Sequence, residues 1–167
     1  MPVTERLILR DTRMSDVRAL FGILGDREAM RHTHCCASLR DCARHVAGHE
    51  WQRRRNGHAP WTVLRKADGA VIGWGGLYED PFDPGWGLEV GYWFSPSAWG
   101  HGFASELVEA SLDFAHGRDV TQVSAFARPE NAASCRVLEK AGFRKERFVE
   151  SLARNLYRRE LGEPGGS

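Results

Sequence analysis

The sequence predicts an α/β (α+β) fold, and the clearest evidence is a strand, a loop and a helix that follow one another in residues 88–115. Residues 88–94 form a strand-like apolar run, and residues 95–104 form a turn rich in glycine and serine. After the turn, small and apolar residues recur at helical spacing, at Ala104, Leu107, Val108, Ser111, Leu112 and Ala115. A strand therefore leads through a tight loop into the first turn of a helix.

A β-hairpin is the second strong signal. Apolar runs at residues 61–64 and 71–78 are joined by a segment that contains Asp68-Gly69, a dipeptide typical of hairpin turns. Patterning and capping residues add further strands at 3–10, 120–127, 143–150 and 152–161, and helices at 15–24, 39–55 and 131–141. We therefore expect a single mixed, mostly antiparallel sheet of six to seven strands with about four helices. In the helix over 39–55, Val46 and Trp51 are expected to face inward.

Length and composition indicate one domain and exclude several classes of protein. The 167 residues with 42% hydrophobic content suit one core, so we expect a single domain over residues 1–162 and a flexible tail at 163–167. A formal net charge of +1 argues against nucleic acid as the main ligand. The chain shows neither an apolar run of membrane length nor a signal-peptide pattern, which predicts a cytoplasmic protein with no membrane contact. Its four cysteines are expected to be reduced thiols.

Histidine and cysteine gather in residues 32–49, so a metal site has to be considered. His45 and His49 share a helical face, but the segment has neither an HExxH motif nor repeated cysteine pairs. We expect exposed histidines on the polar face of a helix that begins near Ser38, and no metal.

The turn after residue 94 predicts an anion site. Gly100 and Gly102 let the backbone approach a ligand closely, and the first N–H groups of the following helix have no partner within the helix. These donors and the helix dipole together favour phosphate or pyrophosphate. Two glycines also occur in ordinary tight turns. The P-loop pattern is excluded because the loop continues Gly-Phe-Ala, and the dinucleotide pattern is excluded because Ser105 stands where a third glycine or alanine is needed.

The same residues resemble the GNAT superfamily of acyl-CoA-dependent N-acetyltransferases. Residues 99–104, Trp-Gly-His-Gly-Phe-Ala, are similar to its pyrophosphate-binding turn, Gln/Arg-x-x-Gly-x-Gly/Ala, with Trp99 in the Gln/Arg position. Tryptophan there, and Gly91-Tyr92-Trp93 before it, resemble the ribosomal-protein-alanine acetyltransferase (RimJ/RimL-like) branch. A second signature runs from Asn131 to Phe143, and the resemblance extends from Glu5 to about Leu161.

This resemblance implies a GNAT-like fold whose sheet is splayed between the strand that ends at Phe94 and the strand that begins at Val120. It also implies acetyl-CoA as the co-substrate, held in that gap. The backbone of the strand would pair with the pantetheine arm, and the N–H near Phe94 would polarise the acetyl carbonyl. The implied cofactor-binding residues are Tyr92, Trp93, Phe94, Trp99, Gly100, His101, Gly102, Phe103, Ala104, Ser105, Asn131 and Ser134.

Two residues are candidates for proton transfer. Glu89 lies on the same strand as Phe94 and is the candidate base for an ammonium acceptor, directly or through water; the alternative is an exposed carboxylate without a role. Ser134 falls where the resembling branch has a serine near the CoA sulfur, which makes it the candidate acid for the departing thiolate. Asn131 is expected to cap the helix, to contact pantetheine, or both. Cys135 projects about 100° away from Ser134 on the helix, which argues against a cysteine nucleophile.

The expected reaction is acetylation of a primary amine by direct attack on the thioester. The acceptor would be a peptide or protein N-terminus, or a small-molecule amine. Acidic residues in the loop at 79–86 would favour a cationic amine, or they are simply a solvated connection. A domain that binds CoA or acyl-CoA without turnover is the alternative function. The chain is expected to be a monomer or a homodimer.

Overall fold

The computed structural model describes residues 2–162, which form one seven-stranded sheet and four α-helices. The strands are β1 (Leu7–Asp11), β2 (Trp61–Arg65), β3 (Val71–Tyr78), β4 (Glu89–Phe94), β5 (Gln122–Ala127), β6 (Arg144–Val149) and β7 (Arg154–Glu160). The helices are α1 (Val17–Leu24), α2 (Leu39–Asn56), α3 (Phe103–His116) and α4 (Ala132–Lys140). This arrangement confirms the predicted fold class. The tail predicted at 163–167 lies outside the described residues.

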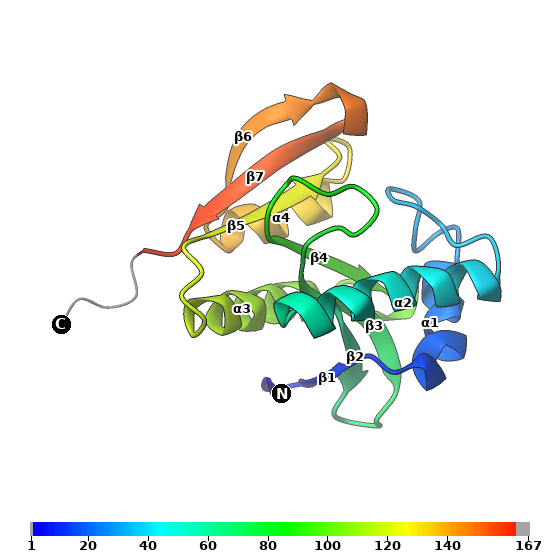
Figure 1. Cartoon of the computed structure of the whole chain (residues 1–167). Helices are drawn as coiled ribbons and strands as arrows, with labels where there is room; N and C mark the ends of the chain where they lie inside the picture. The colour runs from blue at the N-terminus through cyan, green and yellow to red at the C-terminus, as the bar shows by residue number, and fades with distance from the viewer. Residues whose placement is uncertain (1, 163–167) are drawn as a thin grey trace.

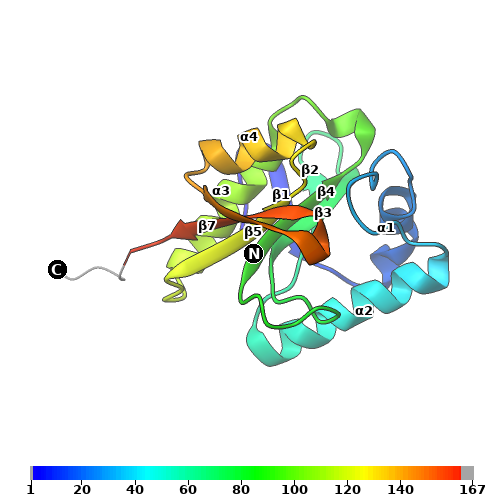
Figure 2. The same cartoon turned by 90° about the horizontal axis from the view of Figure 1, so that it is seen from above.

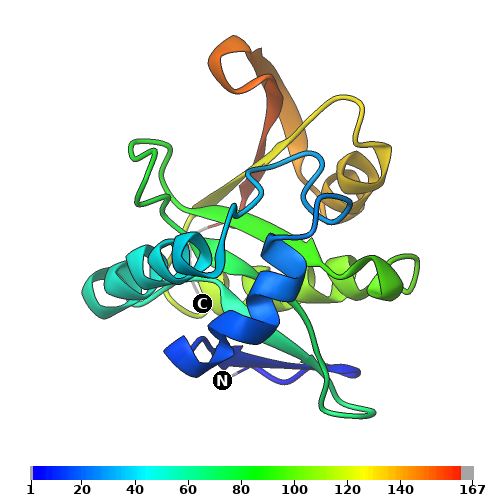
Figure 3. The same ribbon diagram turned by 90° about the vertical axis from the view of Figure 1, so that its right-hand side faces the viewer.

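Helices cover both faces of the sheet. Helices α1 and α2 lie on one face, and α3 and α4 lie on the other (Figures 2 and 3). The core under α1 and α2 includes Trp74, whereas Leu107 and Val108 of α3 are buried against the opposite face. We call these the α1/α2 face and the α3/α4 face. Among residues 2–162, no helix has the length and apolar character that a membrane span requires.

The sheet opens at its centre. The strand order is β1-β2-β3-β4-β5-β7-β6, and β4 and β5 form its parallel pair. In the described part of the chain these two strands are in register only at Glu89 and Ser124, beside a hydrogen bond from the Ser124 N–H to the Leu88 carbonyl (2.9 Å). Beyond this point β4 and β5 diverge (Figure 1). The predicted splay is therefore present.

The register also fixes where the backbone of β4 points. The Ser95 N–H donates to the Ile72 carbonyl at 2.9 Å, so residue 95 bonds toward β3, whereas the Leu88 carbonyl bonds toward β5. Because bonding direction alternates along a strand, the N–H and C=O groups of Tyr92 and Phe94 point away from β3 into the gap. The gap is thus lined by main-chain donors and acceptors that β5 does not use.

Helix α2 differs from its prediction on two counts. Trp51, expected to face inward, is 54% exposed, with the Arg55 guanidinium 4.4 Å from its ring. His49, expected on the polar face, is buried, and its ring lies 5.1 Å from that of Trp74. The buried stripe runs through Cys42, Val46 and His49, at i, i+4 and i+7, and Trp51 lies about 200° around the helix from His49. The histidine therefore occupies the core position that the tryptophan was predicted to fill.

Candidate active site

The turn before α3 has the geometry of an anion site. Gly100 and Gly102 adopt φ values of +76° and +79°, a region that favours glycine. Gly102 is the N-cap of α3, and no side chain of residues 2–162 caps the start of this helix. The first intrahelical bond runs from the Glu106 N–H to the Gly102 carbonyl, which leaves the N–H groups of residues 103–105 available. The predicted anion-binding donors are therefore unobstructed.

Arg6 at the start of the chain holds this turn in place. Its Nη1 donates to the His101 carbonyl at 2.7 Å, and its Nε pairs with Glu106 at 2.8 Å. Its guanidinium also lies 4.7 Å from the Phe103 ring centre. Burial acts to raise the pKa of Glu106, but hydrogen bonds from Thr4 and Arg6 outweigh it, so that pKa is lowered and the carboxylate stays charged. This support was not predicted, because its partners are 100 residues apart in the sequence.

A large cavity of about 520 Å³ begins at this turn and extends into the gap on the α3/α4 face. The structure brings most of the predicted cofactor-binding residues into its wall, namely Tyr92, Phe94, Trp99, Gly100, Gly102, Phe103, Ala104, Ser105, Asn131 and Ser134. The Trp99 indole N–H donates to the Phe94 carbonyl at 3.1 Å, which fixes the turn against the end of β4.

Two residues of the predicted set lie outside this cavity. Trp93 points to the α1/α2 face, where its ring lies 5.3 Å from that of Trp74, because side chains alternate along β4. His101 is exposed, with its ring 5.7 Å from that of Phe103. Its carbonyl, rather than its side chain, takes part in the site through Arg6.

Three cations that were not predicted line the same cavity. Arg136 and Lys140 lie one turn apart on α4, and Arg31, from the segment between α1 and α2, has its guanidinium 5.7 Å from the Trp99 ring centre. Their charges suit the phosphates of a nucleotide cofactor. The i, i+4 spacing of Arg136 and Lys140 after the Asn131 cap could have revealed them, whereas no local pattern marks Arg31.

Ser134 and Tyr92 meet where the strands part. The Ser134 and Tyr92 hydroxyl oxygens are 2.7 Å apart, and the Asn131 side chain accepts from the Ser134 N–H at 3.2 Å. Asn131 is thus the predicted N-cap of α4. Burial raises the pKa of Tyr92 to about 12, against the effect of its hydrogen bond with Ser134. The tyrosine therefore stays neutral and can donate to the serine oxygen.

Glu89 lies in a second, smaller cavity of about 70 Å³. Its side chain points to the α1/α2 face, because Val90 and Phe94 point to the other. Glu89 is only 5% exposed, which contradicts the alternative of a solvated strand carboxylate. Burial, followed by the negative charge of Asp80, raises the pKa of Glu89 to about 8, although the positive charge of Arg154 opposes both. A carboxyl group with this pKa can take up and release a proton near neutral pH.

The two cavities meet at the splay. Tyr92, Asn131, Ser134 and His32 line both of them. One reactant can therefore enter from the α3/α4 face and the other from the α1/α2 face, and they would meet between a candidate acid, Ser134, and a candidate base, Glu89. The geometry suits a transfer between two bound substrates.

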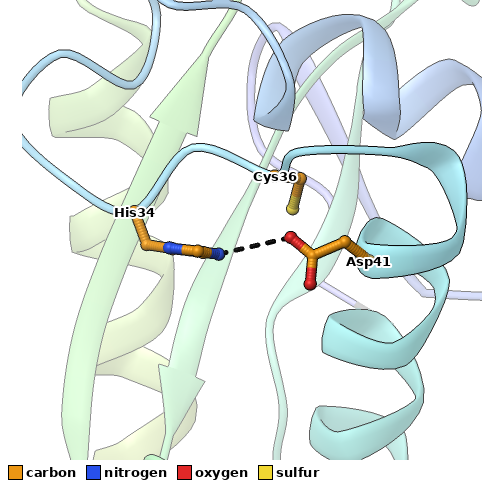
Figure 4. A group of neighbouring side chains, drawn as sticks. All are labelled: His34, Cys36 and Asp41. Atoms are coloured by element: carbon orange, nitrogen blue, oxygen red, sulfur yellow. Dashed lines mark ion pairs between the residues drawn. The ribbon is translucent and has the colours of Figure 1, made fainter.

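The histidine- and cysteine-rich segment forms a separate cluster. The ligand atoms of His34, Cys36 and Asp41 lie within 4.8 Å of one another (Figure 4). Asp41 already pairs with Arg44 at 2.8 Å and His34 at 3.4 Å, and it accepts from the Ala37 N–H. The Arg44 hydrogen bond, followed by that of Ala37, lowers the pKa of Asp41 to about 2. These contacts account for the cluster as the N-terminal cap of α2, and the absence of a metal stays a prediction.

Comparisons with known proteins identify the family. The domain described as Acetyltransferase (GNAT) matches residues 6–144. The uncharacterized protein YkkB of Bacillus subtilis is 29% identical over 149 residues, which cover 88% of this chain and 87% of that protein. A solved GNAT-family acetyltransferase from Bordetella pertussis superposes with a TM-score of 0.81 at 22% identity, over 95% of this chain and 98% of the other.

A solved acetyltransferase from Salmonella typhimurium, which modifies the N-terminal serine of a ribosomal subunit protein, superposes with a TM-score of 0.78 at 22% identity. The match covers 96% of this chain and 98% of that one. At this identity the likeness concerns the fold, and it agrees with the RimJ/RimL-like resemblance of the sequence. The family match covers most of the chain. The chain therefore belongs to the GNAT family of acetyltransferases.

Proposed function

We propose that this acetyltransferase moves an acetyl group from acetyl-CoA to a primary amine by direct attack of the amine on the thioester. The observation that supports this most is the pair of cavities that meet at the splay, with free main-chain groups of β4 between them. A domain that only stored CoA would have no need of the second cavity or of a buried carboxyl group with a raised pKa.

The large cavity would hold acetyl-CoA. Its pyrophosphate would accept hydrogen bonds from the amides of residues 103–105, and Arg31, Arg136 and Lys140 would neutralise the phosphate charges. The pantetheine arm would pair with the free backbone of β4, and the Phe94 N–H would donate to the acetyl carbonyl oxygen. Relatives of the same fold bind CoA, among them a RimL solved in complex with coenzyme A, which supports a CoA site in this fold.

The chemical step needs one base and one acid. The amine nitrogen would attack the acetyl carbon, forming the C–N bond while the C–S bond breaks. The proton lost by the amine would pass to the Glu89 carboxylate, directly or through water. The departing CoA thiolate would take a proton from the Ser134 hydroxyl as Ser134 takes one from water, so the serine ends neutral; the Tyr92 hydroxyl lies 2.7 Å from the serine oxygen. Glu89 would then release the amine proton to solvent. Cys135 has no part in this scheme, since its Sγ is engaged with the Arg128 carbonyl at 3.6 Å.

We propose that residues 1–162 act as one N-acetyltransferase domain, as a monomer or homodimer in the cytoplasm. A peptide N-terminus and a small-molecule amine are the two acceptor types that the family resemblance supports. The activity of the Salmonella relative on a ribosomal protein supports the first type.

The proposed function predicts that thiol is released from acetyl-CoA when a suitable amine is present. The measurement is a thiol assay over a panel of peptides, amino acids, polyamines and aminoglycosides, with a thermal shift assay in parallel. CoA should raise the melting temperature, and at least one amine class should give thiol. If CoA raised the melting temperature but no amine led to thiol release, the result would contradict acetyltransferase activity and favour a CoA-binding module.

Ser134→Ala is expected to lower kcat by about 10-fold and to leave the Kd for CoA nearly unchanged, because the hydroxyl acts only on the leaving thiolate. Stopped-flow thiol release and calorimetry measure the two quantities.

Tyr92→Phe should lower kcat less than Ser134→Ala does. The double variant should have a kcat only slightly below that of Ser134→Ala, because Tyr92 acts through the serine. Equal losses of kcat and CoA affinity in Ser134→Ala would show that the serine is a binding residue instead.

A further inference from the structure

Two arginines face each other beside the smaller cavity. Ala127 pairs with Asn155 in the β5–β7 ladder, so Arg128, the residue after β5, lies across from Arg154, the first residue of β7. Ala127 packs in the core of the α3/α4 face. Since side chains alternate along a strand, Arg128 and Arg154 project to the α1/α2 face, the same face as Glu89.

The charges of these arginines are poorly neutralised. The Nε atoms of both are buried, and neither has a hydrogen-bond partner within residues 2–162. Arg128 has an exposed ion-pair partner in Glu130 at 3.8 Å, and no acidic group in the described part of the chain lies within 4.0 Å of Arg154. Like charges placed across a ladder destabilise it, and buried donors without partners add to that cost. A bound anion would remove both penalties.

Both arginines line the cavity that contains Glu89 and Ser134. Glu89 is opposite Ser124, and Arg128 follows Ser124 by four residues, just beyond the end of β5, which is roughly 13 Å between backbone positions. Arginine side chains reach back over part of this span, and the charge of Arg154 already acts on Glu89. An anion on the arginines would therefore belong to the molecule whose amine meets Glu89.

The opposite end of this region is negative. Glu89 is influenced by Asp80 and Asp83 of the loop between β3 and β4, and that loop reaches β5 through Trp86, whose ring lies 5.2 Å from that of Phe126. The cavity wall thus carries one carboxyl group, that of Glu89, on which Asp80 and Asp83 act from the loop, and the two guanidinium groups of Arg128 and Arg154. Its volume of about 70 Å³ suits a small molecule. This distribution of charge matches a molecule with an amine and a carboxylate a few bonds apart.

We propose that the acceptor is a small amino acid-like amine, whose carboxylate is bound by Arg128 and Arg154 while its amine faces Glu89. This inference rests on the proposed acetyl transfer and specifies its acceptor class. Guanidinium groups bind carboxylates through paired, charge-assisted hydrogen bonds. An acceptor without the carboxylate would therefore lose the hydrogen bonds to Arg128 and Arg154.

The experiment compares free amino acids with their carboxamides, which keep the amine and lack the negative charge. Wild-type protein should acetylate the best amino acid with a kcat/KM about 10-fold or more above that of its amide. Arg154→Gln and Arg128→Gln should bring this ratio close to one and leave the Kd for CoA unchanged. Because the charge of Arg154 also acts on Glu89, the readout is the ratio of the two kcat/KM values and not the rate on either substrate alone. Arg65→Gln, at a half-buried arginine of the β2–β3 hairpin that pairs with Asp68, is the matched control and should leave the ratio intact.

A binding measurement makes the test independent of turnover. With CoA present, the N-acetylated amino acid should bind wild-type protein about 10-fold more tightly than its carboxamide, and this preference should vanish in Arg154→Gln. If the amino acid and its amide had equal kcat/KM values, or if neutral peptides had higher values than free amino acids, the proposed acceptor class would be wrong. The proposed acetyl transfer would not be affected by either result. Thiol release from no amine would reject the proposed function, whereas an intact preference in both arginine variants would reject only the arginine site.

Discussion

Replacing Glu89 by glutamine is expected to lower kcat by about 100- to 10,000-fold, the range that a positioned general base contributes. Glutamine keeps the size and much of the hydrogen bonding of the buried side chain but cannot accept the proton of the amine. The Kd for acetyl-CoA should be unchanged, because Glu89 faces the cavity on the opposite face of the sheet. Pre-steady-state acetyl transfer and calorimetry measure the two effects, with Glu109→Gln on the exposed side of α3 as the control.

The pH dependence gives this prediction a second readout. A base works only when it is deprotonated, and the pKa of Glu89 is raised to about 8, so kcat should rise with pH through that value. In Glu89→Gln this ascending limb should disappear. The acceptor amine also titrates, so the profile should be measured with two amines of different pKa. A limb that moves with the amine pKa and persists in Glu89→Gln would assign the titration to the substrate and contradict the role of Glu89.

The free energy of unfolding should fall as pH rises, whereas kcat should increase. A pKa raised from 4.5 to about 8 means that the folded protein holds the proton more tightly than the unfolded chain. The contribution of Glu89 to the free energy of unfolding is therefore fully present below the pKa of this group in the unfolded chain. It decreases as pH rises to about 8, by at most about 5 kcal/mol. Glu89→Gln should lack this fall. Denaturant unfolding across the pH range measures the difference, and identical slopes for both proteins would show that the carboxyl is not held protonated.

Ala104→Glu is expected to weaken CoA binding by about 10- to 100-fold relative to Ala104→Gln, because it adds a negative charge beside the site proposed for the pyrophosphate. Ala104 lies in the first turn of α3 and in the wall of the large cavity. A carboxylate there interacts favourably with the helix dipole, so the protein should not be destabilised by its charge. The two variants have side chains of nearly the same shape, and calorimetry with CoA compares them.

A ligand without the pyrophosphate is the control for that comparison. Acetylpantetheine keeps the thioester and the arm that would lie along β4 but has no phosphate. The two Ala104 variants should therefore bind it equally. A similar loss for acetylpantetheine and CoA would indicate a general disturbance of the cavity, and no difference between the variants toward CoA would place the pyrophosphate elsewhere.

Local sequence patterns predicted the parts of this fold that local physics determines. Asp68-Gly69 marked the β2–β3 hairpin, Asn131 marked the start of α4, and the glycines at 100 and 102 marked the turn before α3. Each of these features depends on a backbone conformation or a cap that neighbouring residues decide. The opening between β4 and β5 came from the family resemblance rather than from these patterns, because no local signal records where two strands stop pairing.

Features that depend on tertiary contacts were missed or misplaced. The support of the turn by Arg6 joins the first strand to α3, and the Ser134–Tyr92 contact joins α4 to β4. Periodicity of a strand says which side chains share a face but not which face meets the large cavity, so the sequence did not show that the Trp93 side chain lies on the α1/α2 face. The facing of Arg128 and Arg154 follows from sheet register, which the sequence alone does not give.

A crystal structure of the protein with CoA tests the central claim most directly. The account predicts pyrophosphate oxygens within about 2.7–3.2 Å of the amide nitrogens that begin α3. It also predicts that the sulfur lies in the gap between β4 and β5, near the Ser134 hydroxyl. A cofactor bound with its pyrophosphate away from residues 103–105, or with its sulfur outside the gap, would contradict the account.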